Sequence, residues 1–322
     1  MSNQPWLDAV QQDLQEVERL LERVTTVEYP PLTLLLQHTL LNKGKRLRPA
    51  LVLLAASFHN YRREVLLPTA AAVELLHTAT LVHDDLIDNA RSRRGSPTLN
   101  TLTSERATVL VGDYLFAQSA ILAVTCQNIR AIQSFSRALA TICDGELREV
   151  LTAGVLTNTK EDYYLRIESK TAALFSTATE TGGILSDAPE SACQALQEYG
   201  HSLGMAFQIV DDVLDFVGDE REMGKPVGND LRQGTLTLPA IQLMEMYPHD
   251  NTLADLFGDP ADGEEKVRRV VEMVVNSPAV ERCYAEARRF VSQAQAALQP
   301  LPDNQYRRAM MELAEYVVGR RQ

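Results

Sequence analysis

Several features that mark common classes of protein are missing from this chain of 322 residues. Positive charge is scarce: the formal net charge of −12 argues against nucleic acid or an anionic membrane as the main partner, because both attract basic surfaces. The four cysteines show no Cys-x-x-Cys spacing and no zinc-site arrangement with histidine. We therefore expect them to be in the reduced state and to serve in packing. The start lacks the pattern of a secretory signal, and no apolar segment reaches the ~18 residues of a membrane span. These absences predict a cytoplasmic protein without a membrane span.

The chain also lacks an internal boundary. Its length alone would suit two domains, but no linker rich in proline, glycine or serine divides it, and no solenoid-type repeat is present. Hydrophobic residues make up 45% of the sequence, enough to bury a large core. We therefore predict a single domain over residues 1–322.

Apolar residues recur at helical spacing almost everywhere, and prolines stand at the expected helix starts and connections. The sequence therefore predicts an all-α fold, a large helical bundle around a central cavity. The expected helices cover residues 5–24, 32–41, 49–58, 68–90, 104–126, 130–153, 160–184, 190–217, 234–246, 263–275, 278–298 and 303–319.

An acidic triplet with the spacing i, i+1, i+4 occurs twice, as Asp84, Asp85 and Asp88 and again as Asp211, Asp212 and Asp215. On a helix the three carboxylates of each triplet fall within roughly 100° and can point toward one ligand. Both triplets follow core-like residues, where ionised carboxylates need compensating cations. Mg²⁺ prefers oxygen ligands and bridges carboxylates to phosphates, so the pattern predicts a site for Mg²⁺ and a diphosphate. Two solvated helix faces are the alternative, which the repetition in apolar settings disfavours.

Cations cluster near the triplets, where charge-assisted hydrogen bonds from lysine and arginine could hold a phosphate. Single basic loops are usually only solvated. Their order around the triplets is the stronger signal, and the candidate residues are Lys45, Arg46, Arg48, Arg93, Arg94, Lys170 and Lys225.

The ordered set GKRLRP, HTATLVHDDLIDNARSRRG, GDYLF, KTAALF, FQIVDDVLDF and GKPVGNDL resembles the trans-isoprenyl diphosphate synthases, the polyprenyl synthetase family. The resemblance covers the chain from about residue 30 onward. It implies an all-helical isoprenoid synthase fold, usually a homodimer, in which the two triplets face each other across an apolar cavity. There they hold about three Mg²⁺ ions on an allylic diphosphate.

The resemblance also assigns roles to individual residues. All six aspartates would serve as direct or water-mediated Mg²⁺ ligands. Arg93, Lys170 and Lys225 would hold the allylic diphosphate. Isopentenyl diphosphate would be held by Lys45, Arg48, His77 and Arg94. Thr171 and Gln208 would line the reacting centre, where their dipoles could stabilise a carbocation.

Other matches to the family are less specific. His83 is expected to be structural. Tyr316 and Arg320-Arg321 resemble a C-terminal tail that closes over the site, although a frayed end fits equally well. The chain departs from the family at Thr235, where lysine is usual, and in Lys43-Gly44-Lys45, where Gly-Gly-Lys is usual.

The implied chemistry requires no nucleophilic Ser or Cys. Each cycle lengthens the chain by one isoprene unit, and the limit on product length should be steric. The family places a bulky aromatic residue four or five positions before the first aspartate in enzymes that make short products, whereas this chain has Thr80 and Ala79. Leu76 continues the same wall one turn earlier. A long-chain polyprenyl diphosphate synthase is predicted, with a geranylgeranyl or farnesyl diphosphate synthase as the alternative. A class I terpene cyclase and a non-catalytic subunit are the rivals from other classes.

Overall fold

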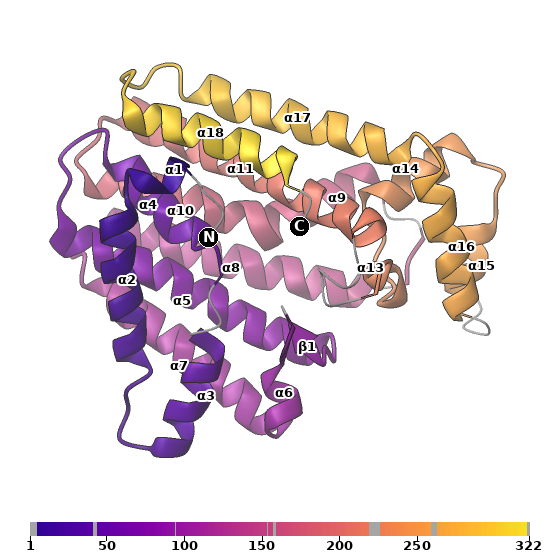
Figure 1. Cartoon of the computed structure of the whole chain (residues 1–322), viewed down its shortest axis with the longest axis horizontal. Helices are drawn as coiled ribbons and strands as arrows, with labels where there is room; N and C mark the ends of the chain where they lie inside the picture. The colour runs from indigo at the N-terminus through magenta and orange to yellow at the C-terminus, as the bar shows by residue number, and fades with distance from the viewer. Residues whose placement is uncertain are drawn as a thin grey trace. The chain divides into compact units, whose positions relative to one another are not determined.

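The computed structural model describes residues 5–40, 44–93, 95–152, 154–156, 159–218, 226–258 and 263–320. In these ranges the chain is helical almost throughout, as Figure 1 shows. The strands described there are β1 (Ser92–Arg93) and β2 (Ser96–Pro97), which pair as a short antiparallel hairpin. The predicted all-α fold is confirmed.

The chain divides into two compact units. The first comprises Met1–Leu139, Leu174–Gly200 and Gln295–Leu313, and the second comprises Ala140–Ala173, His201–Ala294 and Ala314–Gln322. The single domain over residues 1–322 stays a prediction.

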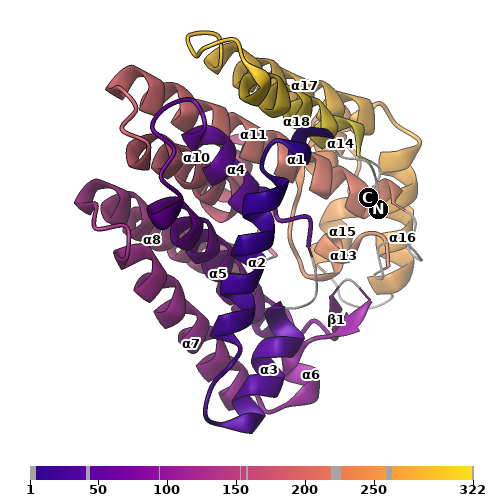
Figure 2. The same cartoon turned by 60° about the vertical axis from the view of Figure 1, so that its left-hand side comes forward.

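The first unit is built around α5 (Arg63–Ile87), which packs against α2, α4 and α7. Figures 1 and 2 show α7 running alongside α5 in both views. The other complete helices of this unit are α1 (Pro5–Asp8), α2 (Gln11–Val24), α3 (Pro30–Leu40), α4 (Leu47–Ala56), α6 (Leu99–Leu102) and α7 (Glu105–Val124).

Two of these helices bear on the expectation that no apolar segment is long enough to span a membrane. By length and composition alone, α5 and α7 could each span a membrane, and on that criterion the expectation was wrong. In α5, 67% of the apolar window is buried within the protein, as in an ordinary core helix, against 33% in α7. The exposed apolar side chains of α7 are Val109, Leu110, Ile121 and Val124.

The second unit contains the continuous stretch Lys160–Ala172, in which α9 (Lys160–Ile167) passes into a π-helical segment, η1 (Glu168–Ala172). Thr159 begins α9 with a capping box: its hydroxyl accepts from the Asp162 N–H, and the Asp162 carboxylate accepts from the Thr159 N–H. In this unit α16 packs against its neighbours α13, α14 and α15. The bounds are α13 (Asn229–Arg232), α14 (Leu238–Met246), α15 (Thr252–Gly258) and α16 (Gly263–Val275).

The boundaries of the two units fall within four further helices. These are α8 (Ile129–Thr152), α11 (Glu190–Val217), α17 (Ala279–Ala297) and α18 (Gln305–Gly319). The helix α10 (Ala173–Leu185) lies in the first unit from Leu174 onward.

Most expected helices are present, and the differences have local causes. The helix expected from residue 68 begins at Arg63, because Pro68 near a helix start removes one backbone donor without ending the helix. The helix expected over 5–24 is interrupted after Asp8. The short α6 and α15 and the β-hairpin were not predicted, since segments of this length carry almost no periodic signal.

Candidate functional site

The first acidic triplet stands at the C-terminal end of α5, and its carboxylates face different surroundings. Asp85 is buried, Asp84 is half-buried, and Asp88 is exposed at the helix C-cap. The buried Asp85 accepts a hydrogen bond from Nε of Arg93 at 2.7 Å. Burial raises the pKa of Asp85, although the charge of Arg93 acts in the opposite direction. In this structure the Asp85 carboxylate is thus paired with Arg93, and its role toward a ligand shared with Asp84 and Asp88 stays a prediction.

Arg93 owes its position to the β-hairpin that follows the triplet. The register pairs Arg93 with Ser96 and Ser92 with Pro97, and Gly95 at the turn has a φ of +75°, which favours glycine. The Arg93 side chain stays 40% exposed while it is bound to Asp85. The next candidate, Arg94, lies outside the described residues.

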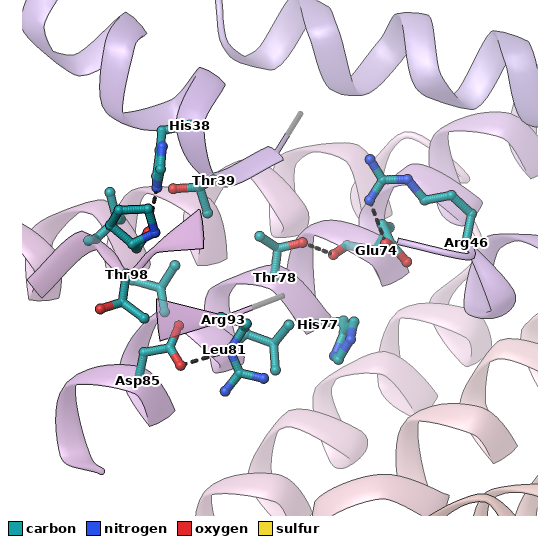
Figure 3. A pocket seen from close by; sticks show the side chains of 13 residues that line it. His38, Thr39, Arg46, Glu74, His77, Thr78, Leu81, Asp85, Arg93 and Thr98 are labelled. Atoms are coloured by element: carbon teal, nitrogen blue, oxygen red, sulfur yellow. Dashed lines mark hydrogen bonds and ion pairs between the residues drawn. The ribbon is translucent and has the colours of Figure 1, made fainter. Parts of the chain in front are cut away.

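A cavity of about 80 Å³ lies beside α5 in the first unit (Figure 3). Its α5 wall includes His77, Asp85 and Glu74, and its other walls carry Arg46 and Arg93. Two of the residues expected to hold diphosphates, His77 and Arg93, thus meet at one cavity. The remaining lining residues are His38, Thr39, Thr78, Leu81, Val82, Pro97, Thr98 and Leu99.

The residues expected to limit product length lie on the other side of α5. At about 100° per residue, the α5 residues of the cavity span an arc of roughly 140°, and Leu76, Ala79 and Thr80 fall in the opposite part of the helical wheel. Leu76 and Ala79 are fully buried, and the half-buried Thr80 donates to the carbonyl of His77.

Helix α7 covers this second face of α5. The Ser119 hydroxyl of α7 donates to the carbonyl of Ala72 at 2.9 Å. Near the triplet, the ring of His83 lies against Gly112, with its Nε2 atom 3.1 Å from the carbonyl oxygen of Val109. His83 is thus a packing residue in this structure, as expected, and a side chain at position 112 would collide with it.

Lys45 and Arg48 lie on either side of the start of α4. Lys45 is exposed and Arg48 is half-buried. The guanidinium carbon of Arg48 lies 4.7 Å from the centre of the Phe175 ring, a cation–π contact that orients the side chain.

The second triplet, on α11, also contains both buried and accessible carboxylates, but two of its members are buried instead of one. Asp211 is exposed, whereas Asp212 and Asp215 are buried. The Tyr163 hydroxyl donates to Oδ2 of Asp212 at 2.7 Å, and Nε2 of Gln208 donates to Oδ1 at 2.8 Å. Burial raises the pKa of Asp212 to about 7, while the two hydrogen bonds favour the charged form.

Asp215 holds the start of α13 by two hydrogen bonds. Its Oδ2 atom accepts from the backbone N–H of Asp230 at 3.1 Å, and its carbonyl accepts from the N–H of Gly228 at 2.7 Å. Gly228 has a φ of +71°, so glycine is favoured there. The candidate Lys225 lies outside the described residues.

The C-terminal tail also reaches the second triplet. Arg320, only 7% exposed, lies 3.4 Å from Oδ1 of Asp211 and stacks over the Phe207 ring at 3.8 Å. Burial lowers the pKa of Arg320, and the nearby Asp211 opposes this shift. Within the described residues the tail is therefore anchored at Arg320 rather than frayed, and Arg321 lies outside them.

Lys170 and Thr171 lie in the π-helical segment η1. Such segments often occur at functional sites, because the extra residue in the turn changes the direction of the side chains. Thr171 donates to Oε1 of Gln208 at 2.6 Å. Gly145 of α8 allows the close approach of this segment, since a Cβ there would lie 2.5 Å from that of Ser169. Thr171 and Gln208, expected at one reacting centre, are therefore in direct contact.

The ammonium group of Lys170 lies between two carboxylates, 3.1 Å from Glu146 and 2.9 Å from Glu149. Thr235, where the family usually has lysine, donates to Glu149 at 3.5 Å. Burial alone would raise the pKa of Glu149, but the charges of Lys170 and Arg166 outweigh it and lower the pKa. Because position 235 carries threonine where the family usually has lysine, it adds no positive charge beside Glu146 and Glu149, which share Lys170.

Sequence reasoning missed Tyr163, Glu146 and Glu149. Tyr163 precedes Lys170 by two helical turns, a spacing that places both residues near one face, but aromatic residues at such spacing usually belong to the core. The two glutamates lie on α8, which carries none of the acidic triplets.

The carboxylates present can be compared with what a metal ion needs. Among the residues that the structure describes, no group of three or more His, Cys, Asp or Glu side chains could hold a metal ion by itself. The exposed Asp88 and Asp211 and the half-buried Asp84 offer hard oxygen donors, which suit Mg²⁺ bound jointly with a substrate phosphate. The donor set fits such a shared site better than a closed protein cage.

Known proteins match nearly the entire chain. The sequence pattern of the polyprenyl synthetase family matches residues 30–274. Heptaprenyl diphosphate synthase component 2 of Geobacillus stearothermophilus is 38% identical over 305 residues, covering 95% of both chains. Octaprenyl diphosphate synthase of Escherichia coli (strain K12) is 34% identical over 278 residues, covering 86% of both chains.

A solved structure agrees with these matches. The polyprenyl synthase from Caulobacter crescentus CB15, complexed with calcium and isoprenyl diphosphate, has a TM-score of 0.95 at 32% identity, covering 98% of this chain and 97% of that one. The fold and these matches identify a prenyltransferase. The chain belongs to the polyprenyl synthetase family. The family and the class of enzyme predicted from the motifs are confirmed.

Proposed function

We propose that this protein is a long-chain trans-polyprenyl diphosphate synthase, which condenses isopentenyl diphosphate with an allylic diphosphate in repeated cycles. The names of the relatives, heptaprenyl and octaprenyl diphosphate synthases, support a long-chain product over geranylgeranyl or farnesyl diphosphate. The small Ala79 and Thr80 before the first triplet support the same product class.

The observation that carries the metal assignment is the division within each triplet. Asp84, Asp88 and Asp211 are accessible at least in part, whereas Asp85, Asp212 and Asp215 are buried. We assign direct Mg²⁺ coordination to the three accessible aspartates. The three buried ones act through water or by fixing their neighbours. About three Mg²⁺ ions would hold the allylic diphosphate in this proposal.

The chemistry that Mg²⁺ supplies is neutralisation of the departing diphosphate. Arg93, Lys170 and Lys225 add positive charge there, and Lys45, Arg48, His77 and Arg94 hold isopentenyl diphosphate. Gln208 is fixed by Thr171 and Asp212, so its amide presents an oriented dipole at low reorganisation cost beside the allylic cation. The cation forms when the C–O bond to the allylic diphosphate breaks. The isopentenyl double bond then forms the new C–C bond to that cation, and a proton passes to the departed diphosphate to complete each cycle.

The proposed assembly is a homodimer. The exposed apolar residues of α7, Val109, Leu110, Ile121 and Val124, supply the kind of surface that a second copy of the chain would cover. A cytoplasmic location stays a prediction.

The proposal is tested with purified protein, radiolabelled isopentenyl diphosphate and several allylic primers, with and without Mg²⁺. Long polyprenyl products that require both substrates and Mg²⁺ are expected. A hydrocarbon formed from the primer alone would identify a terpene cyclase. Inactivity of the homogeneous protein would indicate a non-catalytic subunit.

The metal assignment has its own variants. Asp84→Asn and Asp211→Asn should each lower turnover by about a hundredfold or more while the fold is retained, because a ligand loses its charge. Asp144→Asn, at an exposed aspartate of α8 paired with Arg148, is the matched control and should stay near wild type. Near-normal Mg²⁺-dependent turnover in both triplet variants would contradict the assignment.

A further inference from the structure

Arg46 differs from the cations on either side of it in the sequence. Lys45 is exposed and the half-buried Arg48 packs over the Phe175 ring, whereas the Arg46 side chain, 11% exposed, is surrounded by acceptors. Its backbone has a φ of +49°, the left-handed region, although it carries a full side chain. Such a conformation is unfavourable for a residue that carries a Cβ and persists where the surroundings hold it.

The surroundings that hold Arg46 come from three other helices. Nε and Nη2 donate to the two carboxylate oxygens of Glu18 on α2, at 2.5 and 3.3 Å. Nη1 donates to Glu74 on α5 at 2.7 Å, the contact drawn in Figure 3, and Nη2 also donates to the carbonyl of Leu40 at the end of α3, at 2.9 Å. One guanidinium group therefore ties α2, α3 and α5 to the start of α4.

Both ends of this network adjoin residues assigned to isopentenyl diphosphate. Arg46 stands between Lys45 and Arg48 in the sequence. Glu74 precedes His77 by three residues on α5, so the two side chains are neighbours on one helix face, and both line the cavity of Figure 3. The network thus connects the two segments that carry the assigned cations, α4 and α5.

The charges around Arg46 argue against a role in which it binds the diphosphate directly. The guanidinium donors of Arg46 are already paired with two carboxylates. Both pairs are largely removed from solvent, because the Glu18 side chain is 24% exposed and the Glu74 side chain is 7% exposed. Pulling the guanidinium away to bind a diphosphate would leave two buried carboxylates without their cation, which is costly. Arg46 is therefore held back from the substrate.

We propose that Arg46, through Glu18 and Glu74, is a positioning residue that sets Lys45, Arg48 and His77 in the geometry that binds isopentenyl diphosphate. This inference rests on the proposed function, because the substrate is the one assigned there. It predicts a dependence of isopentenyl diphosphate binding on carboxylates that do not touch the substrate.

The test compares the two substrates in Glu74→Gln, which keeps the side-chain shape and removes the charge. We expect the KM for isopentenyl diphosphate to rise about tenfold, with the KM for the allylic primer changed by less than about twofold. Calorimetric binding of isopentenyl diphosphate alone should weaken by a similar factor. Arg46→Lys, which keeps the charge but loses the fork, should change the same constants in the same direction.

The matched control is Glu16→Gln on α2, where Glu16 forms an exposed pair with Arg19 and no change is expected. If Glu74→Gln does not fold, the same comparison is made with Glu18→Gln, at the more exposed of the two carboxylates. Equal changes in both KM values, or unchanged isopentenyl diphosphate binding in a folded variant, would overturn the inference. Failure of the wild-type protein to elongate a primer would instead overturn the proposed function.

Discussion

The contact between His83 and Gly112 allows a prediction whose size follows from the structure. A Cβ atom added at position 112 would lie 2.1 Å from Nε2 and 2.4 Å from Cδ2 of His83, where ordinary contact begins at 3.4 Å. In Gly112→Ala the ring must therefore move by more than an ångström. The ring has little room to do so, because Nε2 donates to the carbonyl of Val109 and the ring packs 5.4 Å from that of Phe116.

The expected effect has two parts. Overpacking of this kind costs about 1–3 kcal/mol of stability, and each kcal/mol lowers the Tm of a chain this long by about 2 °C or less, because the shift per kcal/mol falls with chain length. His83 is followed directly by Asp84, so a shift of the ring also moves a proposed metal ligand. A misplacement of about 1 Å at a reacting centre can lower turnover by about a hundredfold.

Thermal unfolding measures the loss of stability. Initial rates over a range of Mg²⁺ concentrations measure the loss of turnover. The double variant Gly112→Ala/His83→Ala should recover part of the stability lost in Gly112→Ala, because the colliding ring is gone, and the coupling follows from a double-mutant cycle. Gly258→Ala, where an added Cβ meets nothing within 4 Å, is the control. A Gly112→Ala protein with wild-type Tm and wild-type rate would refute the packing argument.

Three further substitutions follow from the sites described. Tyr163→Phe removes a donor to the buried Asp212 and should lower the free energy of unfolding by about 1.5–3 kcal/mol in urea titrations, and a loss below about 0.5 kcal/mol would contradict this. Ala79→Tyr should shorten the products to roughly three or four isoprene units by filling the tunnel wall, and an active variant with wild-type products would show that the tail does not pass this residue. Thr235→Lys adds a cation beside Glu149 and should lower the KM for the allylic diphosphate; a raised KM would count against the role given to this cluster.

The sequence predicted the helices because a strong periodic pattern marks their length. The ranges 190–217 and 263–275 match α11 and α16 at both ends. The π-helical segment around Lys170 was missed, because a single turn with i→i+5 bonds scarcely changes the apolar pattern of the helix that contains it.

For the site, the sequence predicted which residues carry the chemistry but not which partners they take. Asp84 and Asp85 are adjacent and identical, yet only the second is buried against Arg93. The Tyr163 partner of Asp212 is 49 residues away, and no local pattern connects them. Such pairings depend on tertiary packing, and the periodic patterns of a single sequence do not reveal them.

The division of α5 into two faces affects how the product of such an enzyme can change during evolution. His77 and the cavity lie on one face, while Ala79, Leu76 and the packing against α7 lie on the other. Under the proposed function, substrate capture and product length are then separate heritable traits of a single helix. Substitutions on the α7 side can give a new product while the extender substrate is bound as before, so a family of synthases with different products can arise by changes confined to one stripe of one helix.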